Sequence, residues 1–403
     1  MSARQHAVAI DAGSTGTRLH VVAWRPGAQG PVLVEVHPNW TRKVQPGLSS
    51  QSPREGAASL APLLRFAASI VPTSTQHRTP LLLFGTAGVR LLAAPQQAAL
   101  YSAARAACAA SGFLSVGSSF RTLEGREEGE AGLLALGWLG GSWLSGAAPR
   151  DLGLIDLGGG SAQIAFPLSA STELRAAEHA LHGSVPLPGS LPSGGSLISR
   201  SLLGYGNRAA LLRTEALLTA DSEALRTAGE LAASTAHVRH PCFHRGWAYS
   251  SRGVRFEGSS DPHRCAALVR RLFAADGPPP RFERPPLPPA HVRFYAVSAA
   301  FFIANFLHSQ QPIAGMPAPA LRDVRSAAEA HCAQEWEAVQ RRARDNYTTE
   351  EKLPMRCFDA TYLLALLVRA WVRVRAYLLT LLVRARPAPP TCWCCCPPPA
   401  PHT

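Results

Sequence analysis

The stretch AIDAGSTGTRLHVVAW at residues 9–24 decides the fold. It sets Asp11 and a turn of glycine and hydroxyl residues between two apolar runs of the kind that form β-strands. The stretch LGLIDLGGGSAQIAF at residues 152–166 repeats this plan, with Asp156 in the place of Asp11. Glycine turns let backbone N–H groups point at phosphate oxygens, which a Cβ would obstruct. The matched pair therefore predicts two hairpins that grip one polyphosphate from opposite sides.

The rest of the chain alternates strand and helix patterns, which is typical of an α/β protein. Apolar runs predict strands at residues 7–10, 19–24, 32–36, 81–84, 152–155, 163–166 and 292–297. Helices are predicted at residues 53–70, 95–110, 127–144 and 207–218, and proline-dense stretches predict loops at residues 183–195 and 276–289. With 403 residues, of which 46% are hydrophobic, the chain is long enough for two domains with separate cores.

The charge and the motif content exclude several classes of protein. The formal net charge is +13, and arginines that are scattered along the chain supply most of it. A basic surface attracts polyanions, but the chain lacks a nucleic-acid-binding motif with interleaved aromatic residues. A free nucleotide is therefore favoured over a nucleic acid as the partner. The P-loop motif GxxxxGK[ST] does not occur, which argues against a P-loop enzyme.

Five of the nine cysteines lie in the body of the chain. Their order predicts two local disulfides, Cys242 with Cys265 and Cys332 with Cys357, and leaves Cys108 over. Each disulfide would contribute about 3 kcal/mol if oxidised. The histidines of HVRHPCFHR at residues 237–245 also suggest zinc, but no second cysteine pair follows at finger spacing, so a disulfide loop is the favoured interpretation.

Other signals bear on the compartment. The sequons at Asn39 and Asn346 fit a lumenal or secreted protein. The opening residues MSARQH form no signal peptide, so either the leader is absent from this sequence or the disulfide argument fails. Residues 362–383 are apolar at both ends, but three arginines at the centre argue against a membrane-spanning helix, and a buried helix that runs into an amphipathic or aberrant extension is expected instead.

Two more segments connect the hairpins to a known family. LLLFGTAGVRLL at residues 81–92 and TLEGREEGEAGLLALGWLGG at residues 122–141 lie between them. In order, the four segments resemble the first four conserved regions of the nucleoside triphosphate diphosphohydrolases, or apyrases, and are most similar to the endomembrane, nucleoside-diphosphatase members. SLLGYGNRAALL, FYAVSAAFFIANF and CFDATYLLALL extend the resemblance over about residues 7–368. It implies the two-lobed actin-like, Hsp70 and sugar-kinase ATPase fold (ribonuclease H-like), with the active site between the lobes.

The resemblance also implies roles for residues. Glu128 would be the general base for the attacking water, with Glu127 and Glu124 as rivals, and Ser161 and Gln163 would orient that water. Asp11 and Asp156 would hold Mg²⁺ or Ca²⁺ through water. Arg90 would brace its loop rather than touch the substrate. The expected phosphate ligands are Ser14, Thr15, Gly16, Thr17, Thr86, Ala87, Gly158, Gly159 and Gly160.

The nucleobase site is less defined. Some cell-surface members stack the base between an aromatic ring and an arginine that follows a Tyr-Gly pair. Here Asn207 follows Tyr205 and Gly206, with Arg208 as an adjacent substitute. The aromatic wall is expected from Phe301 or Phe302, although a buried helix face is the competing interpretation for these rings. The base preference stays open.

These features predict an N-terminal lobe at residues 1–135, a C-terminal lobe with both disulfides at residues 136–368, and a basic Pro- and Cys-rich tail at residues 369–403, expected to be disordered. The tail departs from the family, which continues there with a helix and a strand that carries a W-x-L-G signature. Loss of an internal strand would cost several kcal/mol of stability.

The predicted function is hydrolysis of nucleoside di- or triphosphates to the nucleoside monophosphate and inorganic phosphate, in the lumen of the Golgi or endoplasmic reticulum or outside the cell. A membrane anchor would be lost from or absent in this chain, and no oligomeric state is predicted. The alternative is a catalytically impaired lumenal paralogue that binds nucleotide or regulates a partner. A sugar kinase of the same superfamily is disfavoured by the glutamate pair at residues 127 and 128.

Overall fold

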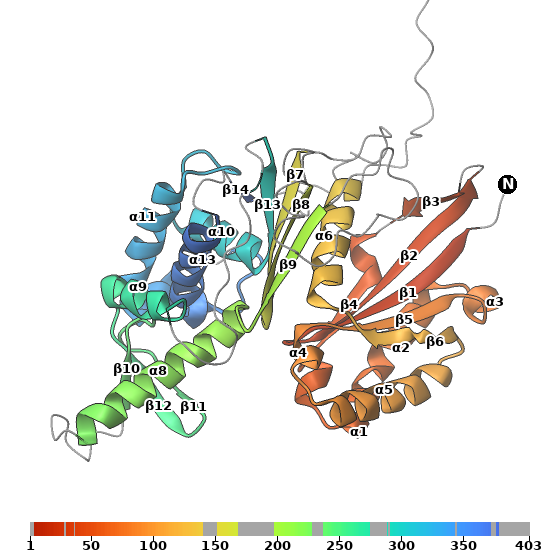
Figure 1. Ribbon diagram of the computed structural model, residues 1–403, viewed down its shortest axis with the longest axis horizontal. Helices are drawn as coiled ribbons and strands as arrows, with labels where there is room; N and C mark the ends of the chain where they lie inside the picture. Colours follow the sequence, from red (N-terminus) through yellow and green to blue (C-terminus); the bar gives the residue numbers. More distant parts are fainter. Residues whose placement is uncertain are drawn as a thin grey trace, which may run out of the picture.

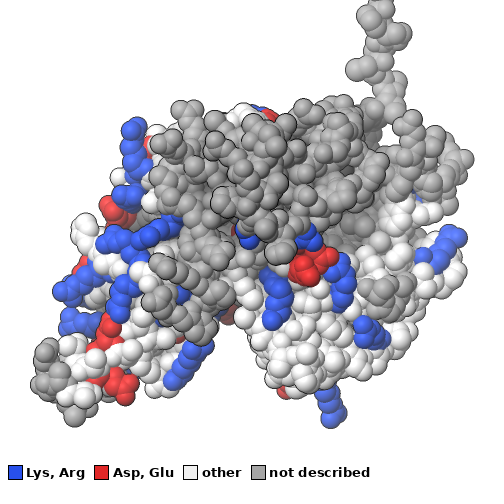
Figure 2. Space-filling model, in the orientation of Figure 1, with Lys and Arg blue, Asp and Glu red and all other residues white. Residues whose placement is uncertain are grey.

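The computed structural model describes residues 4–27, 30–35, 37–139, 151–167, 197–227, 237–274, 288, 291–342, 345–371 and 376–378. Two mixed β-sheets, each with its own helices, form two halves that lie side by side (Figure 1). On the face drawn in Figure 2, the coloured side chains are separate basic groups with acidic groups among them.

The first sheet has the strand order β3-β2-β1-β5-β6, and β4 also pairs with β2. Its strands are β1 (Gln5–Ala12), β2 (Thr17–Gly27), β3 (Gly30–Glu35), β4 (Thr41–Val44), β5 (Pro80–Gly85) and β6 (Leu114–Thr122). β1 to β3 are antiparallel neighbours, whereas β5 runs parallel to β1 and β6 runs parallel to β5. The segments that accompany them are η1 (Pro38–Trp40), η2 (Leu48–Ser50), α1 (Pro53–Ser59), α2 (Ala61–Ile70), α3 (Thr73–Gln76), α4 (Ala87–Arg90) and α5 (Ala94–Ala109).

The helix predicted at residues 53–70 is two helices. Ser52 caps α1 with a reciprocal capping box to Glu55, and the chain turns at Leu60 before α2 begins. Pro62 lies in the first turn of α2 and has no N–H to donate back into α1, so a continuous helix would lose a hydrogen bond there.

The second sheet repeats the topology of the first, with the order β9-β8-β7-β13-β14 in place of β3-β2-β1-β5-β6. Its strands are β7 (Leu152–Leu157), β8 (Ser161–Pro167), β9 (Leu197–Leu203), β13 (Arg293–Ser298) and β14 (Ala376–Leu378). A small separate sheet contains β10 (His237–His240), β11 (Ala248–Ser251) and β12 (Val254–Gly258). The other segments of this half are α8 (Asn207–Thr227), α9 (Pro262–Arg271), α10 (Ala299–Gln310), α11 (Leu321–Cys332), α12 (Trp336–Arg341), η3 (Leu353–Met355) and α13 (Arg356–Trp371). The duplication confirms the predicted α/β class.

Helix α6 (Gly125–Leu139) follows the first sheet in the chain but packs on the second. Leu133 and Leu136 are buried in one cluster with Leu152, Leu154 and Ala165 of β7 and β8. The boundary predicted between residues 135 and 136 therefore falls inside a helix whose apolar face belongs to the second core. The last residues of the helix predicted at 127–144 lie outside the described residues.

The C-terminal segment corrects two expectations. Residues 369–371 continue α13, and β14 pairs in parallel with β13, so the predicted disordered tail does not begin at residue 369. Three residues in an Arg-rich stretch give no strand pattern, yet β14 takes the position in the second sheet that β6 takes in the first. A short edge strand is therefore present in the region that was expected to be disordered, although it does not carry the W-x-L-G signature. Residues 379–403, including the tail cysteines, lie outside the described residues. Within the described ranges, no helix combines the length and the apolar character that crossing a membrane requires.

Both predicted disulfides are confirmed, Cys242 with Cys265 and Cys332 with Cys357. They tie α9 and α11 into the large core of the second half, which also contains α10 and α13. Cys108 is a buried free thiol in the core of the first half. Across the described ranges, no cluster of three or more His, Cys, Asp or Glu residues is placed to hold a metal ion.

Buried histidines make the stability of the second half depend on pH. Burial lowers the pKa of His331 to about 3 from its usual value of 6.5, and His244, Arg342 and Arg356 lower it further. Among the described residues, neither ring nitrogen of His331 has a hydrogen-bond partner. The folded protein therefore holds this ring neutral at a pH where the unfolded chain protonates it.

Replacing His331 by phenylalanine is expected to remove this acid sensitivity. Between pH 7 and pH 5, the wild type should lose about 2 kcal/mol of unfolding free energy relative to the variant, since only its unfolded state gains the proton. Urea unfolding at the two pH values measures the difference. His263→Phe is the control because His263 is exposed. A gap between wild type and His331→Phe that is equal at both pH values would contradict the expectation.

Candidate active site

The two predicted hairpins are present and their turns meet. In the strand registers, Asp11 of β1 lies opposite Arg18 of β2, and Asp156 of β7 lies opposite Gln163 of β8. A Cβ on Gly159 would lie 2.6 Å from Cγ2 of Thr15. The two turns are therefore close enough to act on one ligand.

The second turn is fixed by the start of α8. The backbone N–H groups of Asn207 and Ala209 donate to the carbonyl oxygens of Gly158 and Gly159, both at 3.0 Å. Gly206 lies so close that a Cβ there would be 2.5 Å from the oxygen of Gly159. Only glycine fits this approach, which holds the turn toward the opposite lobe.

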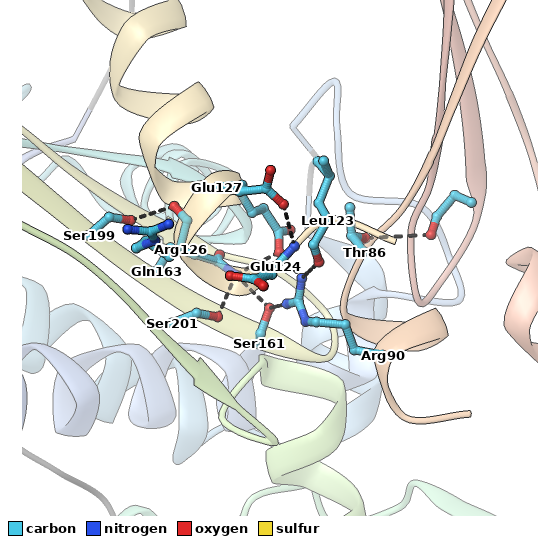
Figure 3. Close-up of polar contacts among 12 residues, drawn as sticks. Thr86, Arg90, Leu123, Glu124, Arg126, Glu127, Ser161, Gln163, Ser199 and Ser201 are labelled. Atoms are coloured by element: carbon cyan, nitrogen blue, oxygen red, sulfur yellow. Dashed lines mark hydrogen bonds and ion pairs between the residues drawn. The ribbon is translucent and has the colours of Figure 1, made fainter. Parts of the chain in front are cut away.

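Glu128 lies in the first turn of α6 and contacts the second hairpin. Nε2 of Gln163 donates to Oε2 of Glu128 at 3.0 Å and lies 2.6 Å from Oγ of Ser161. Arg90 of α4 pairs with Oε2 of Glu128 at 2.8 Å, and its Nη2 donates to Oγ of Ser161 at 3.1 Å. Figure 3 shows Arg90 of α4 approaching Ser161 and Gln163, which both lie on β8. Arg90 also donates to the carbonyl of Leu123, so it links α4 to the segment between β6 and α6.

Glycine in α6 permits the close approach to the second sheet. A Cβ on Gly129 would overlap Oγ of Ser199 on β9, and a Cβ on Gly125 would overlap the side chain of Ser201. Oγ of Ser199 donates to the carbonyl of Arg126 at 2.7 Å. This hydrogen bond holds α6 against β9. The packing places the side chain of Glu128 in contact with Gln163.

The rival glutamates face other partners. Both oxygens of Glu127 accept from Arg121 at 2.8 Å. One of them also accepts from the backbone N–H of Glu124, as Figure 3 shows. Glu124 is exposed. Of the three, Glu128 is the glutamate in contact with the residues expected to orient water.

Three carboxylates of the site carry raised pKa values. Burial raises the pKa of Asp11 to about 6, and Asp156 adds to this, whereas Arg18 and Lys43 oppose it. Burial raises the pKa of Asp156 against a hydrogen bond from Ser298. Burial also raises the pKa of Glu128, which Arg90 opposes and both aspartates reinforce. The three carboxylates therefore share one low-dielectric site.

The aspartates suit a hydrated divalent cation. Among the described residues, Oδ1 of Asp11 and Oδ1 of Asp156 are buried without a hydrogen-bond partner. Buried carboxylate oxygens without partners are costly, and Mg²⁺ and Ca²⁺ prefer oxygen ligands. The two carboxylates repel each other, and each has a buried oxygen without a hydrogen-bond partner. A bound divalent cation would remove both of these costs.

Replacing Arg90 by glutamine is expected to shift the acid limb of the kcat/KM profile to higher pH. In its expected role of general base, Glu128 must be ionised, so activity would fall as pH drops through its pKa, and loss of the guanidinium raises that pKa. A kcat/KM measurement from pH 5 to pH 9 tests the shift. Arg121→Gln is the matched control, since Arg121 pairs with Glu127. An acid limb at the same pH in Arg90→Gln and wild type would refute the coupling.

The expected phosphate ligands divide into two groups. Ser14, Thr15 and Ala87 lie where the two turns and α4 approach one another, because a Cβ on Gly160 would lie 3.0 Å from Cβ of Ala87. The backbone N–H of Thr86 donates a hydrogen bond to the carbonyl oxygen of Ala12, with an N···O distance of 3.3 Å. The side chain of Thr17 is fully buried, so its hydroxyl is not open to a substrate, contrary to the expectation.

The aromatic expectations are partly wrong. Tyr205 is 2% exposed, stacks on Phe273 and lies beneath the guanidinium of Arg213, so its ring belongs to the core rather than to a base site. The side-chain amide of Asn207 donates to Asp359 at 3.4 Å. Arg208, the proposed substitute, lines a different cavity with Trp247 and Tyr249.

Phe301 and Phe302, the two rings expected to form the base wall, differ in exposure, and both contact Tyr347, which no pattern in the sequence singles out. Phe301 is buried in the core, whereas Phe302 is partly exposed on α10. The ring of Tyr347 lies 5.6 Å from the ring of Phe302. Asp345 anchors this loop through Asn305 and the N–H of Thr348. Tyr347 lies in a polar stretch far from residue 302 in sequence, and no spacing pattern links the two.

Comparisons with known proteins agree with this geometry. The GDA1/CD39 (nucleoside phosphatase) family matches residues 2–375. The chain is 28% identical over 396 residues to a Golgi apyrase of Schizosaccharomyces pombe, a match that covers 90% of this chain and 66% of that protein. It is 30% identical over 382 residues to human ectonucleoside triphosphate diphosphohydrolase 2, covering 84% of this chain and 71% of that protein. The chain thus spans about two thirds of the length of these relatives.

A solved structure supports the fold. The crystal structure of nucleoside triphosphate hydrolases from Neospora caninum aligns with a TM-score of 0.59 at 18% sequence identity, covering 91% of this chain and 86% of that chain. At this identity the likeness concerns the fold, and it agrees with the expected two-lobed architecture.

Proposed function

Because the chain belongs to the GDA1/CD39 (nucleoside phosphatase) family, as its four motif segments predicted, we propose that it hydrolyses nucleoside di- or triphosphates to the nucleoside monophosphate and inorganic phosphate. One observation carries the proposal: the half-buried carboxylate of Glu128 contacts Gln163 beside two glycine turns that meet between the halves.

In the proposed mechanism, Glu128 accepts a proton from a water molecule as that water attacks the terminal phosphorus. The amide of Gln163 and the hydroxyl of Ser161 hold the water in line with the bond that breaks. Positioning of this kind and neutralisation of charge supply most of the rate enhancement in phosphoryl transfer. The 2.6 Å contact between Gln163 and Ser161 keeps both groups on one side of the carboxylate.

The phosphate chain would lie along the backbone of the two turns. The N–H groups at residues 14–16, 159 and 160 belong to glycines or to residues with short side chains, which suits close approach by phosphate oxygens. The N–H of Gly158 instead donates to the carbonyl oxygen of Ser161 at 3.0 Å. Asp11 and Asp156 would hold Mg²⁺ or Ca²⁺ through water. Such an ion supplies charge neutralisation to the phosphate oxygens when bound.

We place the nucleobase against Phe302 and Tyr347. Replacing Phe302 by alanine is expected to raise KM for UDP, GDP and ATP by about tenfold, the size of a lost stacking contact. Steady-state kinetics measures this effect. Inorganic tripolyphosphate, which has no base, is the matched substrate control and should change less than twofold. An equal loss with tripolyphosphate would show that Phe302 supports the fold rather than the base.

The setting we propose is the secretory pathway or the extracellular side. One relative is a Golgi apyrase and another is an ectonucleotidase. The two disulfides require an oxidising compartment to form and persist.

A phosphate-release assay tests the proposal. Purified protein is supplied with UDP, GDP or ATP, with Mg²⁺, with Ca²⁺ or with EDTA, and Glu128→Ala serves as the inactive control. Metal-dependent phosphate release by the wild type supports the function. Nucleotide binding without phosphate release in any metal would reject it and favour a regulatory role.

A further inference from the structure

The chain uses lysine at two positions only. Of its 40 lysine and arginine residues, Lys43 and Lys352 are the lysines, and all the others are arginines. One lies in each half, and the two ammonium groups are close enough that the charge of Lys352 acts on Lys43.

Lys43 lies over the first phosphate turn. It stands on β4 opposite Arg18, and a Cβ on Gly16 would overlap Cε of Lys43. The neighbouring Gln45 donates to the carbonyl of Thr15 at 3.2 Å, so this segment is attached to the turn. The ammonium group is therefore carried next to the backbone that would hold phosphate.

Lys352 lies at the opposite wall. Its Nζ is 5.8 Å from the centre of the Phe302 ring, the proposed base wall. It precedes η3, and the charges of Arg356, Asp359 and Arg18 reach it. A nucleotide with its base on Phe302 and its phosphates on the first turn would pass between the two lysines.

Among the described residues neither ammonium group lies at ion-pair distance from a carboxylate, although Asp11 acts on Lys43 and both Asp359 and Asp345 act on Lys352 over longer distances. Arg18 acts on both, so three cations gather at one mouth of the site. Burial and these like charges lower the pKa of Lys43 and of Lys352. An anion with several charges placed between them would relieve the repulsion.

We infer that Lys43 and Lys352 are specificity-determining residues, one ammonium from each half, which together bind the phosphate chain of a nucleoside di- or triphosphate and discriminate against the monophosphate. The inference rests on the proposed function. A monophosphate is shorter and carries less charge, so it cannot engage both groups. Hydrolysis would then break one contact and favour release of the nucleoside monophosphate. A compact ammonium fits over Gly16, where a planar guanidinium is larger.

Selective acetylation provides a direct binding test, because these are the two lysine amines of the chain. The full-length wild type is treated with sulfo-NHS-acetate, and modification of each lysine is measured by mass spectrometry, with the α-amino group as the internal reference. We expect α,β-methylene-ADP with Mg²⁺ to slow acetylation of both lysines at least fivefold. AMP with Mg²⁺ should slow it less than twofold. Equal protection by AMP, or protection of one lysine or neither, would overturn the inference.

Kinetics of variants gives the second readout. Lys43→Met and Lys352→Met are expected to raise KM for UDP and ADP at least tenfold, with a smaller effect on kcat and less than a threefold change in the inhibition constant of AMP. Lys→Arg at each position should restore part of the loss. Arg42→Met is the matched control, since Arg42 neighbours Lys43 on β4 but lies over Phe66. A KM shift equal for Arg42→Met and Lys43→Met would overturn the inference.

The two tests separate this inference from the proposed function. If wild type releases no phosphate from any nucleotide, the proposed function fails, and acetylation still decides whether the lysines bind the phosphate chain. If wild type is active and acetylation is unprotected, the function stands and the lysine inference is wrong.

Discussion

Replacing Glu128 by glutamine is expected to lower kcat for nucleotide hydrolysis by about a thousandfold, in the range found for loss of a general base. Glutamine keeps the shape and can still contact Gln163 and Arg90, but it cannot take the proton of the attacking water. The fold should persist, because the variant removes a half-buried charge whose burial opposes ionisation. Single-turnover phosphate release, with nucleotide affinity measured by calorimetry, separates the chemical step from binding.

Glu127→Gln is the control for this experiment. Glu127 lies in the same helical turn and carries the same charge, but it pairs with Arg121 on the surface. We expect it to change kcat less than threefold. If Glu127→Gln lost a thousandfold in kcat while Glu128→Gln stayed active, Glu127 rather than Glu128 would be the general base.

Replacing Asp156 by asparagine is expected to lower kcat/KM at least a hundredfold and, at the same time, to stabilise the metal-free protein by about 1 kcal/mol. The activity falls because a carboxylate that would hold the cation is lost. The stability rises because a buried charge with an unpartnered oxygen is removed.

The pH dependence of that gain has a definite sign. Burial raises the pKa of Asp156 in the folded protein above its usual 3.8. The ionised wild type is therefore penalised as pH rises through the folded pKa, and the penalty is absent below the unfolded pKa. Urea unfolding in EDTA should show the stabilisation at pH 8 and none near pH 3.

Added Mg²⁺ provides the complementary measurement. It should raise the melting temperature of the wild type but not that of Asp156→Asn, since a ligand stabilises the state that binds it. Asp221→Asn, which removes a surface carboxylate paired with Arg271, should keep the wild-type response. A full Mg²⁺ response in Asp156→Asn would contradict the proposed role.

Most of the correct predictions came from local sequence patterns. The two hairpins, the aspartates before them and the disulfides follow from residues close together in the chain, so periodicity and spacing were sufficient. The contact of Glu128 with Gln163 was implied only by the family resemblance. Its physical cause is the packing of α6 on β9, which Gly125 and Gly129 permit and which no local pattern specifies.

The errors arose where long-range packing decides. Tyr205 belongs to a motif next to the site, but its ring is enclosed by Phe273, which is distant in sequence, and by Arg213 of the helix that follows the motif. Tyr347 was missed because only the fold brings it to Phe302. Strand β14 was missed because its three residues gain their pairing from β13 rather than from their own pattern.

The repeated sheet topology also sets the orientation in which a nucleotide would bind. The two hairpins are equivalent in position but not in chemistry, because Asp156 faces a neutral amide, Gln163, whereas Asp11 faces a guanidinium, Arg18. Under the proposed mechanism, a substrate with a phosphate end and a base end would have one productive direction. The terminal phosphoryl group that the water attacks would lie toward Gln163, and the nucleotide leaving group would lie away from it. The duplicated scaffold would thus form a binding site with two chemically different ends. A nucleotide bound in the reverse direction would have its base end, rather than its terminal phosphate, beside the attacking water.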